Sequence, residues 1–317
     1  MTTTTPTTTG STGAARRAPA PGASEHRSVK TGSVAWMAIP AVAFFVLFGA
    51  VPLIGVGVLS FTQWDGIGAI RWLGGGNWAS VMTDPVMYKA LGLTFGIMIF
   101  SWAVQTPVSL LLGVFTAGTQ KYRAVLAVLY FLPLLMSAAA ISIAFKALLD
   151  PNFGLAASLG IPVLVQNWLG DPTLVLFVII FVLSWMYVPF HSLLYQGGVQ
   201  QIPRSMYEAA SIDGAGTVRQ FFSITLPQLK YTVITSSTLM VVGSMTAFDL
   251  IFVLTAGGPG DASRVLALDM YLRGFRANQM GPASVIAVLI VLIGLGLALF
   301  LRRLGGKDAN SSQMEGL

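Results

Sequence analysis

The sequence predicts an all-α, polytopic membrane protein with six transmembrane helices. Only 9% of its 317 residues are charged and 55% are hydrophobic, whereas soluble domains carry about 25% charged residues. A helix needs roughly 20 apolar residues to cross the hydrocarbon core of a bilayer. Lipid offers no hydrogen-bond partner to an open strand, so continuous apolar runs of this length are expected to be helices. Six windows have the required length: residues 34–60, 91–116, 124–145, 173–195, 231–255 and 282–301.

The two ends of the chain differ in composition from this transmembrane domain, which we place at residues 34–303. Residues 1–33 are rich in Thr, Ala, Pro, Gly and Ser, a composition typical of a disordered tail. A signal peptide is the alternative, because basic residues precede the first apolar run. That run is longer than a signal-peptide core of about 7–15 residues, and no small-residue cleavage pattern closes it. We therefore expect an uncleaved first helix, and a short tail at residues 304–317.

The distribution of basic residues predicts the orientation. If the N-terminus is cytoplasmic, twelve of the 18 Lys and Arg residues fall on inner segments and six on outer loops. Cytoplasmic segments of membrane proteins carry such an excess. Both termini are therefore expected in the cytoplasm. The net charge of +6 follows from this topology, so a nucleic-acid partner is not expected.

The chain offers little for covalent or metal chemistry. It has no cysteine, which excludes thiolate catalysis, cysteine-based zinc sites and disulfides. Its two histidines, His26 and His191, lie in the tail and in an apolar run, so neither a catalytic nor a metal site is expected. A phosphate-binding G-x-x-x-x-G-K-[ST] loop is also missing from the sequence.

The inner loop at residues 196–230 is the most structured hydrophilic segment. Pro203 predicts a helix start, and Ser205 with Glu208 has the spacing of a capping box. A helix over 206–212, a turn at Asp213 and Gly214, and a second helix over 217–223 are expected. On shape alone, a docking helix and an ordinary amphipathic connector remain equally open.

Specific residues of this loop resemble the signature loop of membrane subunits in bacterial ABC importers. The matching pattern is Glu-Ala-Ala, two residues, Asp-Gly-Ala, and later an apolar residue with Leu-Pro, here Phe221 and Leu226-Pro227. The resemblance implies a type I ABC importer fold in which the segment 206–216 docks on a separate cytoplasmic ATPase. ATP and Mg would be bound by that ATPase, and no cofactor by this chain. The implied coupling residues are Glu208, Ala209, Ala210, Asp213, Gly214 and Ala215.

A second resemblance concerns the solute. Residues 247–260, which end in Gly257-Gly258-Pro259-Gly260, resemble a segment of carbohydrate-uptake permeases, and residues 73–85 and 150–154 resemble others. The chain is similar over about residues 34–303 to the larger maltose-transporter membrane subunit and to glycerol-phosphate permeases. A gapless count from the coupling loop transfers six sugar-lining positions of the maltose subunit, and neighbouring polar residues complete the expected path. For each position, helix packing is the alternative. The expected path is Leu183, Ser184, Met186, Tyr187, Phe190, Gly243, Ser244, Ala247 and Asp249.

Asp249 stands apart because a carboxylate inside a membrane helix usually faces a cavity or a partner. It could bond sugar hydroxyls, pair with a basic residue, or cap the helix break before Gly257. The resemblance favours a structural role, since the family has Asp here for varied sugars. His191 is expected to be a packing residue.

Together, the resemblances imply a subunit of an ATP-driven importer for a sugar or related polyol in the bacterial cytoplasmic membrane. Its partners would be a second permease, forming a heterodimer in the lipid bilayer, two ATPase subunits and an extracytoplasmic solute-binding protein. One alternative is an ABC permease for glycerol phosphate or another small solute. A second is an ion-driven carrier, which would need ionisable residues in several helices; only Asp249 is present.

Overall fold

The computed structural model describes residues 1–3, 36–118 and 120–305. Apart from residues 1–3 and 304–305, the predicted tails lie outside this part. The chain divides into two compact units, 1–51 and 52–317. The described part of the first unit is helical and comprises η1 (Trp36–Ala38), α2 (Ile39–Phe45) and η2 (Val46–Ala50). The second unit is also mainly helical, with one short antiparallel hairpin of β1 (Thr62–Gln63) and β2 (Arg71–Trp72) among its described residues.

Every predicted window contains helix, although two of the six windows are broken. Four helical segments are long and apolar enough to cross a membrane: Trp36–Leu59, Pro85–Thr116, Leu174–Gln200 and Met280–Leu304. Two further pairs are bent, by 98° between Lys121–Leu135 and Ala138–Leu148, and by 47° between Lys230–Met245 and Asp249–Thr255. By length and composition the described residues therefore hold four spans, or up to six if each bent pair is one span.

Local chemistry accounts for both breaks. In the first, Pro133 lies in η3 (Leu132–Leu135), and Ser137 then caps α7 (Ala138–Leu148) by accepting a hydrogen bond from the amide of Ala140 at 3.2 Å. In the second, residues 246–248 separate α13 (Lys230–Met245) from α14 (Asp249–Thr255). There the hydroxyl of Thr246 donates to the carbonyl of Gly243 at 3.2 Å, a bond that competes with the helix backbone.

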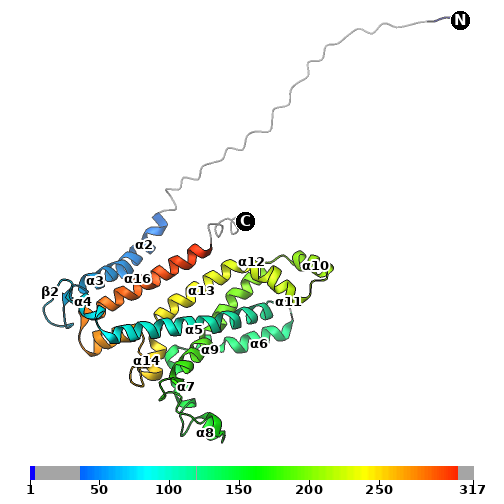
Figure 1. Cartoon of the computed structure of the whole chain (residues 1–317). Helices are drawn as coiled ribbons and strands as arrows, with labels where there is room; N and C mark the ends of the chain where they lie inside the picture. Colours follow the sequence, from blue (N-terminus) through cyan, green and yellow to red (C-terminus); the bar gives the residue numbers. More distant parts are fainter. Residues whose placement is uncertain (4–35, 119, 306–317) are drawn as a thin grey trace. The chain divides into compact units, whose positions relative to one another are not determined.

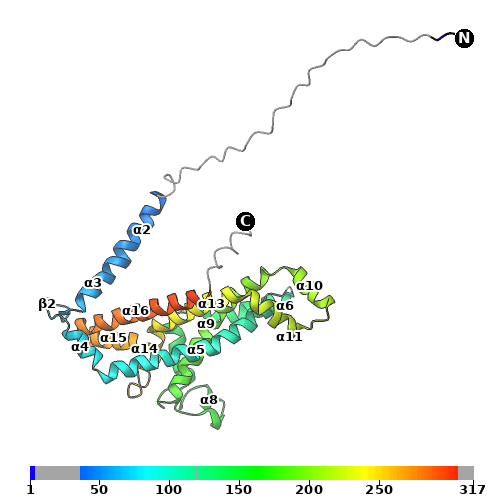
Figure 2. The ribbon, with the colours of Figure 1, turned by 45° about the horizontal axis from the view of Figure 1, so that its top comes forward.

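The long helices α5 (Pro85–Thr116) and α9 (Leu174–Gln200) pack along each other. They come close together at Gly113, where a Cβ would lie 2.6 Å from the Tyr195 Cβ and 2.8 Å from the Ser192 carbonyl oxygen. Small residues permit such contacts between membrane helices. On the other side, α13 packs against both α5 and α16 (Met280–Gly305) (Figures 1 and 2).

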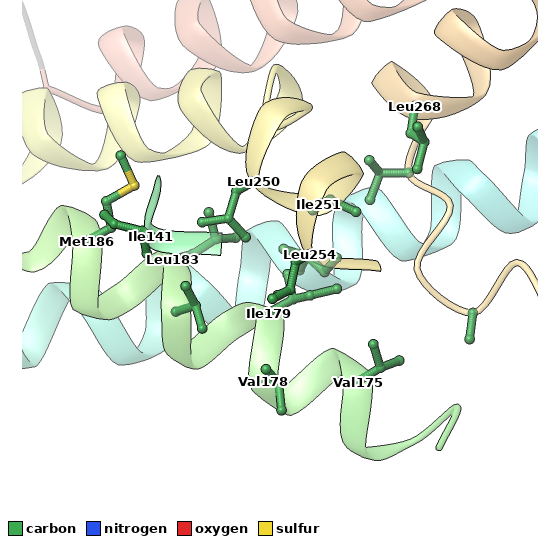
Figure 3. Packing of buried hydrophobic residues seen from close by; sticks show 14 residues of the cluster. Ile141, Val175, Val178, Ile179, Leu183, Met186, Leu250, Ile251, Leu254 and Leu268 are labelled. Carbon is green, nitrogen blue, oxygen red and sulfur yellow. The ribbon is translucent and has the colours of Figure 1, made fainter. Parts of the chain in front are cut away.

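The largest core cluster joins the two broken spans to α9 (Figure 3). Ile141 of α7, Ile179 of α9 and Ile251 of α14 are each almost fully buried within it. Leu268 of α15 (Leu266–Tyr271) closes the cluster. Because lipid tails are as apolar as these side chains, close packing is what holds such helices together. The half-helices α7 and α14 are thereby fixed against α9.

A buried ion network ties the start of α5 to the segment after α14. Asp269 is fully buried and accepts hydrogen bonds from Arg264 at 2.7 Å and from Arg273 at 3.1 Å. Arg273 also pairs with Asp84, which caps α5 by accepting from the Val86 amide at 2.8 Å. Partial burial raises the pKa of Asp84, but the hydrogen bonds and charge of Arg273 outweigh it, so the pKa lies below its ordinary value.

The remaining short elements lie at the ends of these helices. Figures 1 and 2 show α10 (Arg204–Ile212) and α11 (Thr217–Gln220) at one end of the second unit, and α4 (Gly76–Met82) at the opposite end. The other short elements are α3 (Val51–Leu59), α6 (Lys121–Phe131), α8 (Leu155–Ser158), η4 (Pro162–Leu164), η5 (Phe221–Thr225), α12 (Leu226–Gln228) and η6 (Leu272–Arg276).

The expected capping box of the inner loop is wrong. Helix α10 begins at Arg204 with Pro203 in the cap position, and no side chain caps it. Pro203 has φ −58° and ψ 130°, which lets the next residue start the helix and leaves Ser205 inside the first turn. The expected second helix is α11, and it continues into η5.

Candidate functional site

The loop at residues 196–230 contains a helix, α10, that is closed by a left-handed glycine. Gly214 has φ +76°, a conformation that costs residues with a Cβ free energy. The amide of Ala215 donates to the carbonyl of Ala210 at 2.8 Å, and that of Gly214 to Ser211 at 3.1 Å. This pair of bonds is a Schellman motif, which satisfies carbonyls at a helix end. The chain therefore reverses sharply after α10 in a defined geometry.

Side chains brace this turn against the segment that follows it. The Tyr207 hydroxyl lies 2.9 Å from the Thr225 hydroxyl in η5. The Gln220 amide donates to the Ser211 hydroxyl and to the Ala215 carbonyl, both at 2.9 Å. Sequence reasoning did not assign these roles to Tyr207 and Gln220, because nothing local predicts contacts across the turn. With these bonds, α10, the turn and η5 form one braced unit.

The braced unit exposes charged, small and apolar side chains together. Glu208, Ala209 and Asp213 are exposed, and Ile212 is 87% exposed. An apolar side chain this open, beside a carboxylate and small residues, is suited to contact with another protein surface. All six residues expected to couple the chain to an ATPase lie on this helix and its turn: Glu208, Ala209, Ala210, Asp213, Gly214 and Ala215.

A cavity of about 370 Å³ lies where the two broken spans meet α5 and α9. It is bounded by the end of η3 and the start of α7 on one side, and by the break between α13 and α14 on another. Discontinuous membrane helices commonly form solute sites, because the broken backbone there can face a cavity. The cavity is lined by Gln105, Leu134, Ala138, Leu183, Tyr187, Phe190, His191, Leu239, Met240, Gly243, Ser244, Thr246, Ala247, Phe248, Asp249 and Leu250.

Seven of the nine expected path residues line this cavity, and two do not. Met186 instead belongs to the core cluster, and Ser184 is buried away from the lining. Gln105 of α5 is a lining residue that sequence reasoning missed. It is the sole amide side chain of the apolar window 91–116, which is the signal that could have singled it out.

The lining combines aromatic faces with a few polar groups. Tyr187, Phe190 and Phe248 supply the rings, and Gln105 and Asp249 supply polar atoms. Aromatic faces pack against apolar ligand surfaces while polar atoms bond the ligand's rim. The arrangement suits a solute that has both apolar faces and hydroxyl groups.

Asp249 and His191 differ in how they are held. Asp249 is exposed at the first position of α14 and forms no hydrogen bond or ion pair with the residues that the structure describes. His191 is buried, and its Nδ1 lies 2.9 Å from the Ser236 hydroxyl. His191 is thus held by burial and this hydrogen bond and also lines the cavity, whereas Asp249 faces the cavity without a hydrogen-bond or ion-pair partner in the described chain.

Comparisons with known proteins agree on one family. A family model described as "Binding-protein-dependent transport system inner membrane component" matches residues 26–307. The probable ABC transporter permease protein YurN of Bacillus subtilis is 34% identical over 268 residues, which cover 82% of this chain and 91% of that protein. The multiple sugar-binding transport system permease protein MsmF of Streptococcus mutans is 33% identical over 259 residues, covering 79% of this chain and 87% of that protein.

One solved structure shows the same fold. It is a chain from the crystal structure of a bacterial ABC transporter involved in the import of the acidic polysaccharide alginate. The TM-score is 0.78 at 20% identity, over 88% of this chain and 96% of that chain. The arrangement of broken and unbroken helices described above is therefore a known membrane fold.

Proposed function

Because the chain belongs to the family of binding-protein-dependent transport system inner membrane components, we propose that it is the permease subunit of an ATP-driven importer for a sugar or a related polyol. MsmF, a relative at 33% identity, is named as a sugar transport protein. The aromatic and polar lining of the cavity supports the same kind of solute. The solute would cross the membrane through this cavity.

The exposed, braced helix α10 carries the proposal. An ATPase subunit docks on α10 through the small surface of Ala209 and Ala210, the carboxylate of Glu208 and the apolar side chain of Ile212. Small side chains let a partner approach the helix backbone closely. The partner ATPase binds ATP and Mg, and this chain contributes no covalent chemistry.

Movement of the ATPase then reaches the cavity through the helices on either side of the loop. The bond between Tyr207 and Thr225 passes displacement of α10 to η5, which leads through α12 into α13. Since α13 ends at the cavity, a shift of α13 relative to α9 changes the cavity walls. Alternating access follows if the cavity opens to one side of the membrane at a time.

The complete importer contains further subunits. A second permease forms the other half of a heterodimer, two ATPase subunits dock on the two coupling helices, and an external solute-binding protein delivers the sugar. In the proposed topology each bent pair is one span, and the resulting six spans leave both termini and the segment 206–216 in the cytoplasm. The multi-pass chain lies in the cytoplasmic membrane.

The experiment is an uptake assay with and without the ATPase. The probe is the radiolabelled sugar that the purified binding protein retains, supplied to cells that carry the whole importer or lack only the ATPase gene. We expect uptake to disappear without the ATPase and to return when the gene is restored. Proteoliposomes that enclose ATP should also import the sugar when ionophores for protons, sodium and potassium have collapsed these ion gradients. Uptake that survives loss of the ATPase would instead support an ion-driven carrier.

A further inference from the structure

The charged side chains that line the cavity at the two helix breaks are of one sign only. Among its lining residues, Asp249 is the only one with an acidic or strongly basic side chain, and no Lys or Arg lines it. The described chain supplies neither an ion pair nor a hydrogen bond to the Asp249 carboxylate. The remaining polar side chains of the lining are amide, hydroxyl and imidazole groups.

The Asp249 carboxylate attracts hydroxyl groups through hydrogen bonds but repels anions. It can only accept hydrogen bonds, and two neighbouring sugar hydroxyls can donate to its two oxygens. A phosphate or a second carboxylate offers it no donor and repels it. At contact distances and the effective dielectric of a protein surface, one like charge lowers occupancy by about tenfold or more.

The fold itself does not settle the charge of the solute. The alginate importer, whose chain has the same fold, is involved in the import of an acidic polysaccharide. Within this chain, a charge preference therefore depends on the side chains at the cavity. In this chain the relevant side chain is Asp249, placed there by the break that separates α13 from α14.

We propose that Asp249 makes the cavity reject anionic solutes, so that the permease passes neutral or cationic sugars and polyols but not sugar phosphates, uronates or glycerol phosphate. The proposal rests on the proposed transport function. It assigns the substrate class within that function. It also gives Asp249 a specificity-determining role instead of the structural role that the resemblance favours, because Asp249 faces the cavity and has no hydrogen bond or ion pair with the described residues.

The test measures the charge preference of the cavity without the solute or ATP. The chain has no cysteine, so one introduced thiol is the only thiol of this subunit. Gly243→Cys places it on the cavity lining, where a Cβ meets nothing within 4 Å. The assembled importer is treated with methanethiosulfonate reagents bearing a trimethylammonium, a sulfonate or a neutral hydroxyl group, and labelling of this chain is followed by mass spectrometry.

We expect the cationic reagent to react faster than the anionic one, and Asp249→Asn to lower this rate ratio by about tenfold. The rate of the neutral reagent should not change. Ser80→Cys is the matched control, because Ser80 is exposed on α4 and does not line the cavity. The ratio of the cationic to the anionic labelling rate at position 80 should not change with Asp249→Asn.

Two outcomes would overturn the proposal. One is a ratio at position 243 that is the same with Asp and Asn at position 249. The other is a thiol that even the neutral reagent does not reach, because the proposal needs a cavity open to solutes. Neither readout depends on uptake, so failure of the charge preference is distinguishable from failure of ATP-driven transport.

Discussion

The hydroxyl of Tyr207 lies 2.9 Å from the hydroxyl of Thr225, across the turn that follows α10. Tyr207 belongs to the exposed helix, whereas Thr225 is 3% exposed and leads towards α13. Among the described residues, this bond and the two bonds of Gln220 are the side-chain hydrogen bonds that link α10 and its turn to the segment leading to α13. Force applied to α10 therefore has a short physical path into the transmembrane part.

Tyr207→Phe is expected to weaken coupling while leaving the importer assembled. It removes one hydrogen bond, which contributes about 0.5–1.5 kcal/mol, so transport per ATP hydrolysed should fall by about two- to tenfold. The measurement is the ratio of sugar uptake to phosphate release in proteoliposomes. Thr225→Val should give a similar loss, and the double variant should lose little more than either single one. Additive losses would show that the two hydroxyls act separately.

Gly214→Val is expected to uncouple ATP hydrolysis from uptake. A β-branched residue at φ +76° costs about 1–3 kcal/mol, which opens the Schellman motif and loosens the turn. Gly216→Val is the control, because Gly216 has φ −68° and open space around its Cβ position. The measurement is uptake and ATPase activity of complexes purified with all subunits. Normal uptake with Val at position 214 would contradict the coupling role of this turn.

The membrane segments and the turn at Gly214 could be predicted from the sequence because their signals are local. Apolar length marks the membrane segments, and a glycine after an acidic helix end marks the turn at Gly214. The breaks at residues 136–137 and 246–248 were not predicted. Both breaks lie within largely apolar windows, so composition does not distinguish a straight span from a bent one.

The cavity residues likewise divide into those that could be expected from the sequence and those that could not. Its members on α9 and α13 were expected mainly from the resemblance to the maltose subunit, whereas Gln105 reaches the cavity from α5, far away in sequence. Met186 was expected on the path because the gapless count transferred it from the maltose subunit, and Ser184 because it is a polar neighbour of the transferred positions. Which face of α9 turns inward depends on packing against α7 and α14, and the uniformly apolar sequence of α9 carries no periodic signal for that face.

Gly113→Ala is expected to destabilise the protein. The added Cβ would lie 2.6 Å from the Tyr195 Cβ and 2.8 Å from the Ser192 carbonyl oxygen, so α5 and α9 must separate. Overpacking of this kind costs about 1–3 kcal/mol. Gly96→Ala, in the same helix but with nothing within 4 Å, is the control. The measurement is the thermal midpoint in detergent; equal midpoints for the two variants would contradict the close contact.

Asp269→Asn is expected to destabilise the protein more than Asp261→Asn does. Asp269 is fully buried between Arg264 and Arg273, and loss of one partner from a buried ion pair costs about 3–5 kcal/mol. Asp261→Asn is the control, because the Asp261 side chain is 47% exposed in its pair with Arg264 and such pairs contribute about 0–1 kcal/mol. The measurement is the fraction of folded, monodisperse protein after heating. Equal losses would show that burial of Asp269 does not matter.

Asp84→Asn tests the same network through pH. Asn also caps helices well, so the variant keeps the start of α5 but loses the ion pair with Arg273. Partial burial raises the pKa of Asp84, yet Arg273 lowers it further, and the pKa lies below the ordinary value of 3.8. A depressed pKa means that the charged form stabilises the fold above that value, and that this stability is lost as pH falls through the folded-state pKa. The thermal midpoint of the native protein should therefore exceed that of the variant at pH 6, and the difference should shrink as the pH falls below the ordinary value of 3.8 and through the folded-state pKa of Asp84. A difference that stays constant over this range would show that the carboxylate charge of Asp84 contributes nothing to stability.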